Sequence, residues 1–193
     1  MKYFFGVLAF IAAIVVVILL ATNLMRGLND TNTNTNVTKT VDLTDVALKD
    51  SVVRYTMSGA INADENHREI RITISKNART VEVLKGYNGT VEKTVTLPNN
   101  ENAYLAFLNA LSAASFSNKR DNAEGDPNVT CVTGQRYYYE LQSGSDKKVD
   151  TWSTTCSPAQ GNFGGLVAPT AQLFQSQIPA YAEITRGVSL AAF

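Results

Sequence analysis

The sequence predicts an α+β fold: an antiparallel sheet with two packed helices, which follows a single N-terminal transmembrane helix and a flexible stalk. Three observations lead to this fold class. Residues 4–21 form an apolar run, apolar and polar residues alternate in short segments of residues 53–97, and the first helical repeat after them appears at residues 101–115. Strands without intervening helices pair as antiparallel neighbours, so the expected order is β-β-β-β-α-β-β-α.

The apolar run predicts a membrane anchor rather than a cleaved signal peptide. Residues 4–21 carry no charge, and at 1.5 Å per residue they span about 27 Å, close to the thickness of the bilayer core. A signal peptide has an apolar region of about 7–15 residues and a small-residue cleavage site, and TNLMR at residues 22–26 offers no such site. We therefore expect the anchor and its flanks within residues 1–26, with the lipid bilayer contacting residues 4–21.

We expect residues 27–49 to form a flexible stalk. We expect residues 50–193 to form a single domain outside the cytoplasm. The stalk begins GLNDTNTNTN, a polar composition that buries too little apolar surface to fold alone. Lys2 before the anchor favours a cytoplasmic N-terminus. The two cysteines, Cys131 and Cys156, favour a disulfide in an oxidising compartment. The expected localisation is the cell membrane, single-pass, with the C-terminal domain extracytoplasmic.

The four expected strands of the first sheet segment are residues 53–57, 68–76, 80–85 and 91–97. Alternation is clearest where Ile70, Ile72 and Ile74 are separated by polar residues, as in a half-buried strand. Asn88 and Gly89 suit the tight turn before the fourth strand. These segments predict an antiparallel meander.

A helix is expected from residue 101 to about residue 115, with an N-cap supplied by PNN at residues 98–100. Its apolar residues recur at helical spacing: Tyr104, Leu105, Leu108 and Leu111, with Phe107 at the border. This stripe predicts packing on the sheet rather than a cofactor site.

A second hairpin and a second helix complete the expected domain. The hairpin strands are residues 135–142 and 147–155, with Tyr137, Tyr139 and Leu141 on one face. Cys131 and Cys156 flank this hairpin, so their disulfide would close its open end. The last helix is expected at residues 167–177, with Leu173, Phe174 and Ile178 as its apolar face.

Composition excludes several function classes. The chain has 17 basic and 17 acidic residues; Lys2 and Arg26 flank the anchor, which leaves 15 basic against 17 acidic in the exported part. Nucleic-acid binding needs a basic face, so no nucleic-acid partner is expected. The chain also lacks the G-x-S-x-G and phosphate-loop motifs, and we expect no catalytic residues and no cofactor.

Two clusters could hold a metal ion, and both have a simpler interpretation. His67, the single histidine, lies near Asp64, Glu65 and Glu69, which we interpret as a solvated turn because no second ligand pair occurs at a fixed spacing. Asp121, Glu124 and Asp126 are the candidates for a Ca²⁺ site. Their spacing departs from the EF-hand pattern, so an ordinary polar loop is the preferred interpretation and no metal is expected.

Tyr138 and Trp152 are the candidate binding residues. They lie on partner strands of the second hairpin. On an uncovered sheet face they would form an aromatic surface for a protein or a glycan. The competing interpretation, which we prefer at this point, is cross-strand packing beneath a helix.

Several short patterns resemble a group of proteins. They are GAI at residues 59–61, HREIRITIS at 67–75, GY at 86–87, NAY at 102–104 and the pair Cys131 and Cys156. Together they resemble uncharacterised membrane-anchored extracytoplasmic proteins of small-genome candidate-phylum bacteria. The resemblance implies no activity and no catalytic residues.

The expected function is a membrane-tethered extracytoplasmic domain that is not an enzyme, with a role in binding or in cell-envelope and surface interaction. The alternative is an envelope enzyme or inhibitor-like module that acts through the loops at residues 118–130 and 157–166. These alternatives differ in whether the sheet face or the loops form the site.

Overall fold

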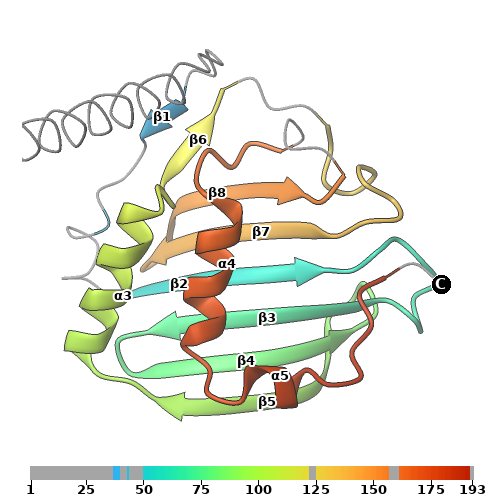
Figure 1. Cartoon of the computed structure of the whole chain (residues 1–193), viewed down its shortest axis with the longest axis horizontal. Helices are drawn as coiled ribbons and strands as arrows, with labels where there is room; N and C mark the ends of the chain where they lie inside the picture. The colour runs from blue at the N-terminus through green and yellow to red at the C-terminus, as the bar shows by residue number, and fades with distance from the viewer. Residues whose placement is uncertain (1–36, 40–42, 44–49, 122–124, 157–160, 192–193) are drawn as a thin grey trace, which may run out of the picture. The chain divides into compact units, whose positions relative to one another are not determined.

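The computed structural model describes residues 37–39, 43, 50–121, 125–156 and 161–191 (Figure 1). The anchor predicted at residues 4–21 lies outside these residues, as do residues 27–36 of the predicted stalk. Among the residues described, no helix has the length and apolar character needed to cross a membrane. All of them belong to one unit of the chain, Asn36–Phe193.

A six-stranded antiparallel sheet is the centre of this unit, with the strand order β5-β4-β3-β2-β7-β8 (Figure 1). Its strands are β2 (Ser51–Ser58), β3 (Arg68–Ser75), β4 (Ala78–Lys85), β5 (Thr90–Pro98), β7 (Arg136–Ser143) and β8 (Asp146–Thr154). The predicted meander is confirmed, because β2 to β5 are neighbours in sequence order. The second hairpin extends the same sheet by pairing β7 with the other edge of β2.

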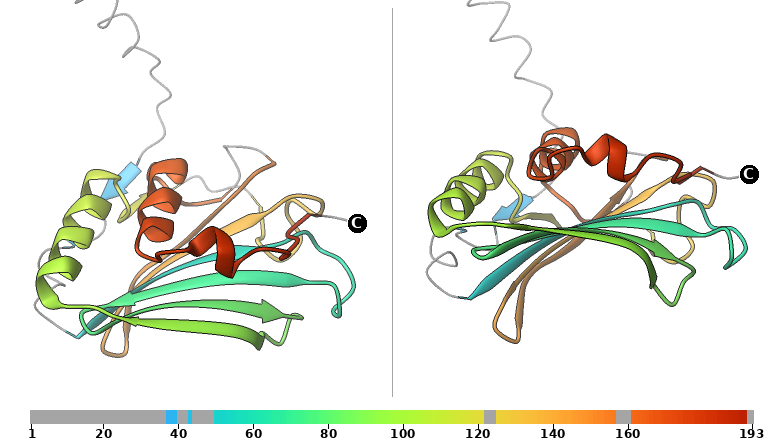
Figure 2. Two further views of the ribbon diagram at one scale, coloured as in Figure 1. Left: turned by 60° about the horizontal axis from the view of Figure 1, so that its bottom comes forward. Right: turned by 90° about the horizontal axis from the view of Figure 1, so that it is seen from below.

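Three helices lie on one face of the sheet (Figure 2). They are α3 (Glu101–Ala113), α4 (Val167–Ser176) and the short α5 (Tyr181–Ile184). The side chain of Asn100 accepts a hydrogen bond from the Ala103 amide at 2.9 Å, which confirms the predicted N-cap of α3. The six strands of the large sheet and the two long helices follow the predicted order, and α5 is an addition that the sequence did not reveal.

The core lies between this sheet face and the helices. Phe174 of α4 packs against Tyr55 of β2 and Phe107 of α3, with ring centroids 5.4 and 5.2 Å apart. The three isoleucines of β3 and both predicted tyrosines of β7 face the same layer, and Tyr139 is fully buried. Alternation in the strands therefore placed the apolar side chains on the helix side, as expected.

A small second sheet joins two segments that the sequence analysis assigned to a stalk and a loop. Strand β1 (Val37–Lys39) pairs with β6 (Asn118–Arg120), and Leu43 is 1 % exposed within the core. The compact unit that contains the large sheet spans Asn36–Phe193, so these contacts lie ahead of residue 50, where the sequence predicts the start of the domain. Polar three-residue strands carry no alternation signal, which is why the sequence did not reveal them.

The predicted disulfide is present. Cys131 and Cys156 are bonded, with their Cα atoms 5.5 Å apart. Cys131 precedes β7 and Cys156 follows β8, so the bridge closes the open end of the β7–β8 hairpin.

Candidate functional site

The face of the sheet opposite the helices is here called the open face, because no described helix covers it (Figure 2). Register identifies its residues. Tyr139 of β7 stacks with Phe163 and contacts Tyr55 on the helix side, so its neighbours Tyr138 and Glu140 point to the open face. Tyr138 and Trp152 therefore do not pack beneath any of the described helices, which lie on the other face of the sheet.

Tyr138 and Trp152 lie directly opposite each other on β7 and β8. They share the open face, but they differ in what they offer a partner. Trp152 is 8 % exposed, so most of its ring is committed to packing. Tyr138 is half-buried, and burial raises the pKa of its hydroxyl, with a smaller opposing effect of Arg136. Tyr138 is thus the aromatic residue of the pair that a ligand can reach.

A hollow of about 310 Å³, here called the central hollow, surrounds Tyr138. It is lined by Arg54, Thr56, Glu69, Arg71, Tyr138, Glu140 and Asp150. These residues come from four adjacent strands, β2, β3, β7 and β8. The lining is mostly polar, with Tyr138 as its aromatic member.

Ion pairs hold the charged side chains of the central hollow in place. Arg54 Nη1 lies 2.9 Å from Glu140 Oε2, and Lys147 Nζ lies 3.1 Å from the other oxygen of the same carboxylate. Burial raises the pKa of Glu140, but the hydrogen bonds from Arg54 and Lys147 outweigh it and hold that pKa below its ordinary value. Glu140 therefore stays ionised, and both of its oxygens have fixed positions.

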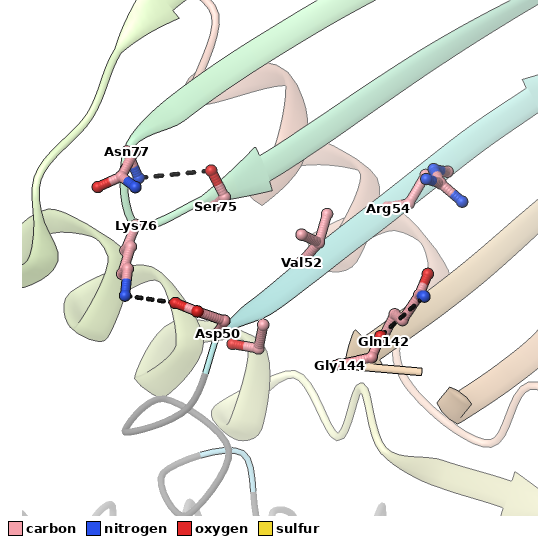
Figure 3. Close-up of a pocket in the computed structure, with 9 residues that line it drawn as sticks. Asp50, Val52, Arg54, Ser75, Lys76, Asn77, Gln142 and Gly144 are labelled. Atoms are coloured by element: carbon pink, nitrogen blue, oxygen red, sulfur yellow. Dashed lines mark hydrogen bonds and ion pairs between the residues drawn. The ribbon is translucent and has the colours of Figure 1, made fainter. Parts of the chain in front are cut away.

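A second hollow of about 400 Å³, here called the end hollow, lies at the start of β2 (Figure 3). Val52 and Arg54 of β2 form its middle, with Lys76 and Asn77 on one side and Gln142 on the other. Arg54 lines both hollows. The two hollows therefore follow β2 along the open face and share one lining residue, Arg54.

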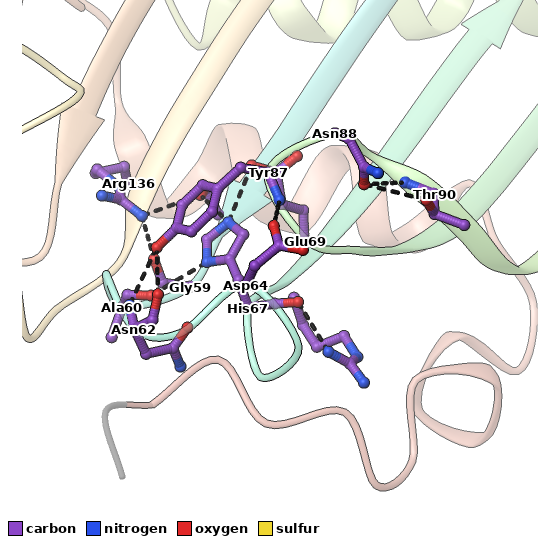
Figure 4. Close-up of polar contacts among 12 residues, drawn as sticks. Gly59, Ala60, Asn62, Asp64, His67, Glu69, Tyr87, Asn88, Thr90 and Arg136 are labelled. Atoms are coloured by element: carbon purple, nitrogen blue, oxygen red, sulfur yellow. Dashed lines mark hydrogen bonds and ion pairs between the residues drawn. The ribbon is translucent and has the colours of Figure 1, made fainter.

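His67 lies at the far end of the open face, and the prediction of a solvated turn is wrong for this residue. His67 is 1 % exposed. Its ring stacks on Tyr87 at 4.1 Å, and its Nδ1 lies 3.2 Å from the Ala60 carbonyl oxygen (Figure 4). The turn between β4 and β5 folds Tyr87 over the imidazole, which a local reading of the sequence does not reveal.

The neighbours of His67 tie the ends of three strands together. Arg136 of β7 donates to Ser58 Oγ at 3.1 Å and to the Gly59 carbonyl, and His67 Nε2 lies 3.4 Å from the same Ser58 hydroxyl (Figure 4). A buried histidine with these partners is a structural residue of the open face.

The candidate calcium loop has a turn geometry of its own. Asp126 Oδ1 accepts hydrogen bonds from the amide and the side chain of Asn128, both at 2.9 Å, so Asp126 closes an Asx turn. Glu124 lies outside the described residues, and Asp121 is exposed. Within the part of the chain that is described, no group of three or more His, Cys, Asp or Glu residues could hold a metal ion.

The two loops of the alternative function meet each other rather than the hollows. Arg120 donates to the Asn162 carbonyl at 2.8 Å, and Gly164 donates to the Asn118 carbonyl at 2.9 Å. Asn162 also accepts from the Trp152 amide at 2.8 Å. The described part of residues 157–166 thus covers the outer edge of β8, and no described residue of either loop lines the central or the end hollow.

Fold and site together define a disulfide-bonded α+β domain whose sheet is covered by helices on one face and carries two polar hollows on the other. No known protein family matches the chain, and no curated protein matches it significantly in sequence.

Proposed function

We propose that the chain is a membrane-tethered extracytoplasmic binding domain, not an enzyme, and that its open face contacts a protein or a glycan of the cell envelope. The observation that carries this proposal is the pair of adjoining hollows on a sheet face that none of the described helices covers. Ligand sites are concave and orient their ligands with a few fixed polar groups, and the ion pairs of Glu140 fix such groups here.

The location outside the cytoplasm is supported by two features. The Cys131–Cys156 disulfide is typical of an oxidising compartment, and the apolar run of residues 4–21 has the length of a bilayer span. In this proposal the N-terminus is cytoplasmic, residues 4–21 cross the membrane, and the domain faces outward.

The binding proposal is tested with the full-length chain and the cell-envelope fraction of its source. Tyr138→Leu removes the reachable aromatic ring and keeps an apolar side chain, so it should weaken binding. Tyr181→Leu is the matched control, because Tyr181 is also half-buried but lies on the helix side. If the wild type, Tyr138→Leu and Tyr181→Leu all bind equally well, the open face is not the binding site.

A third variant separates the sheet face from the loops. Asp126→Ala opens the Asx turn of the 125–130 loop. Asp126 lines neither hollow and acts on Tyr138 only through a minor electrostatic effect. The proposal expects normal binding by this variant. Loss of binding in Asp126→Ala, with normal binding in Tyr138→Leu, would favour the loop-based module.

A further inference from the structure

The two hollows of the open face adjoin along β2, and the surface that they form together is here called the groove. Each takes lining residues from β2 and from its neighbours β3 and β7, and Arg54 belongs to both. From Asp50 to Thr56 the groove follows β2 for about 20 Å, at the usual rise per residue of a strand. A groove of this length suits an extended chain of several linked units rather than one small molecule.

The charges of the groove favour an uncharged ligand. Its basic members are Arg54, Arg71 and Lys76, and its acidic members are Asp50, Glu69, Glu140 and Asp150. Most of these charges are already paired within the protein: Arg54 with Glu140, Lys76 with Asp50, and Arg71 with Glu82. A polyanion would meet carboxylates along the whole groove, and a polycation would meet the three basic groups.

The groove is also unsuited to an extended peptide. Strand β2 is hydrogen-bonded to β3 on one side and to β7 on the other, so no backbone edge is free for strand addition. The large hydrophobic side chains exposed among the described residues are Tyr87, Val91, Val129, Val132 and Leu166. None of them lines either hollow, where Val52 and Tyr138 are the apolar and aromatic lining residues, so the groove lacks the cluster of large exposed apolar side chains typical of protein interfaces.

The polar side chains of the groove can bind adjacent hydroxyl groups of a sugar. The guanidinium of Arg54 and the carboxylate of Glu140, 2.9 Å apart, present fixed donors beside fixed acceptors. Each sugar hydroxyl both donates and accepts, so two neighbouring hydroxyls can engage such a pair. Asn77, Gln142 and Thr56 add neutral polar groups along the groove. Tyr138 supplies an apolar ring face for the C–H groups of a sugar ring.

We infer that the groove binds an extended, uncharged glycan whose rings carry free adjacent hydroxyl groups. This inference rests on the proposed function, which it deepens by naming the ligand class. Arg54 lies at the middle of the site, with Tyr138 in the central hollow and Gln142 in the end hollow.

The test uses the full-length chain in a detergent without a sugar headgroup, with immobilised cell-envelope fraction as the probe. One sample of the fraction is oxidised with periodate, which cleaves the bond between carbons that carry adjacent hydroxyls, and is then reduced with borohydride. A second sample is digested with protease. The expected result is at least about tenfold weaker binding to the oxidised fraction. Binding that survives oxidation overturns the inference, and loss on protease treatment alone identifies a protein ligand instead.

A pair of matched glutamine variants places the glycan in the groove. Gln142 and Gln172 are both exposed, but Gln142 lines the end hollow, whereas Gln172 lies on α4 and lines a separate hollow beside α3. Gln142→Ala should weaken binding about fivefold, the loss of one hydrogen bond, and Gln172→Ala should leave it unchanged. Binding could also be lost on periodate oxidation and yet be unaffected by both Gln142→Ala and Tyr138→Leu. That result would mean that the glycan binds outside the groove.

The two failures are distinguishable. If the Tyr138→Leu variant binds untreated envelope as well as the wild type does, the open face is not the site and the proposed function fails. If Tyr138→Leu reduces binding but periodate does not, the proposed function stands and the glycan inference is overturned.

Discussion

At the residue scale, Gly161 is the position where the fold tolerates a side chain least. Its φ is +93°, and an added Cβ would collide with the carbonyl oxygen of Trp152, which belongs to the backbone of β8. Gly161→Ala therefore combines left-handed strain with a backbone clash, and we expect it to lower the free energy of unfolding by about 2–4 kcal/mol.

Gly89 provides the control for this substitution. Its φ is +67°, and nothing lies within 4 Å of an added Cβ. Gly89→Ala should cost about 1 kcal/mol, from strain alone. Urea denaturation of both variants measures the difference, and equal costs would contradict the clash at Trp152.

Tyr87 is a second residue whose role can be divided into parts. Its hydroxyl donates to the Asn62 carbonyl at 2.9 Å and accepts from the Asn62 amide at 3.1 Å, while its ring covers His67. Tyr87→Phe should cost about 0.5–1 kcal/mol of stability, because these hydrogen bonds are exposed. Tyr87→Ala should cost about 1 kcal/mol more, from the lost stacking. Equal costs in denaturation would show that the ring contact with His67 contributes nothing.

At the element scale, the Glu140 ion pairs join β7 to β2 and to Lys147 of β8. The pKa of Glu140 is lowered in the folded chain from its ordinary value of 4.5, so on acidification the unfolded chain takes up the proton first. The contribution of Glu140 to stability is therefore present above about pH 4.5 and is lost as the pH falls through the lower folded pKa.

Glu140→Gln tests this pH dependence. Its free energy of unfolding should lie about 1 kcal/mol below that of the wild type near pH 7, and the two should converge as the pH falls through the lowered folded pKa of Glu140. Thermal or urea unfolding at a series of pH values measures both curves. A constant difference across the range would mean that the ion pairs do not stabilise the hairpin.

The β7–β8 hairpin also depends on the disulfide at its open end. The bridge links residues 25 positions apart, and loop-closure entropy gives it about 3–4 kcal/mol. The double variant Cys131→Ser with Cys156→Ser should lose this amount in urea denaturation. Adding a reductant should destabilise the wild type to the same level and leave the variant unchanged. A variant as stable as the oxidised wild type would show that the hairpin needs no covalent closure.

At the scale of the whole molecule, local patterns predicted the elements but not their long-range neighbours. Alternation identified Ile70, Ile72 and Ile74 as core residues, because a half-buried strand shows its period in the sequence. The pairing of β7 with β2 has no local signal, since it joins segments about 80 residues apart. The central hollow depends on that pairing. The sequence therefore revealed Tyr138 as a candidate but could not place Arg54 and Glu140 beside it.

The start of the folded unit provides the last prediction. Strand β1 and Leu43 lie in the segment predicted as stalk, yet β1 pairs with β6 and Leu43 is buried in the core. A chain of residues 36–193 should unfold cooperatively, because it keeps the whole unit. A chain of residues 50–193 loses the β1 pairing and the burial of Leu43, worth about 2 kcal/mol for that side chain alone. Urea denaturation should therefore give this chain a free energy of unfolding that is lower by more than about 2 kcal/mol.

Equal stability of the two chains would contradict this prediction. It would mean that residues 37–49 belong to the stalk and that the domain starts at residue 50.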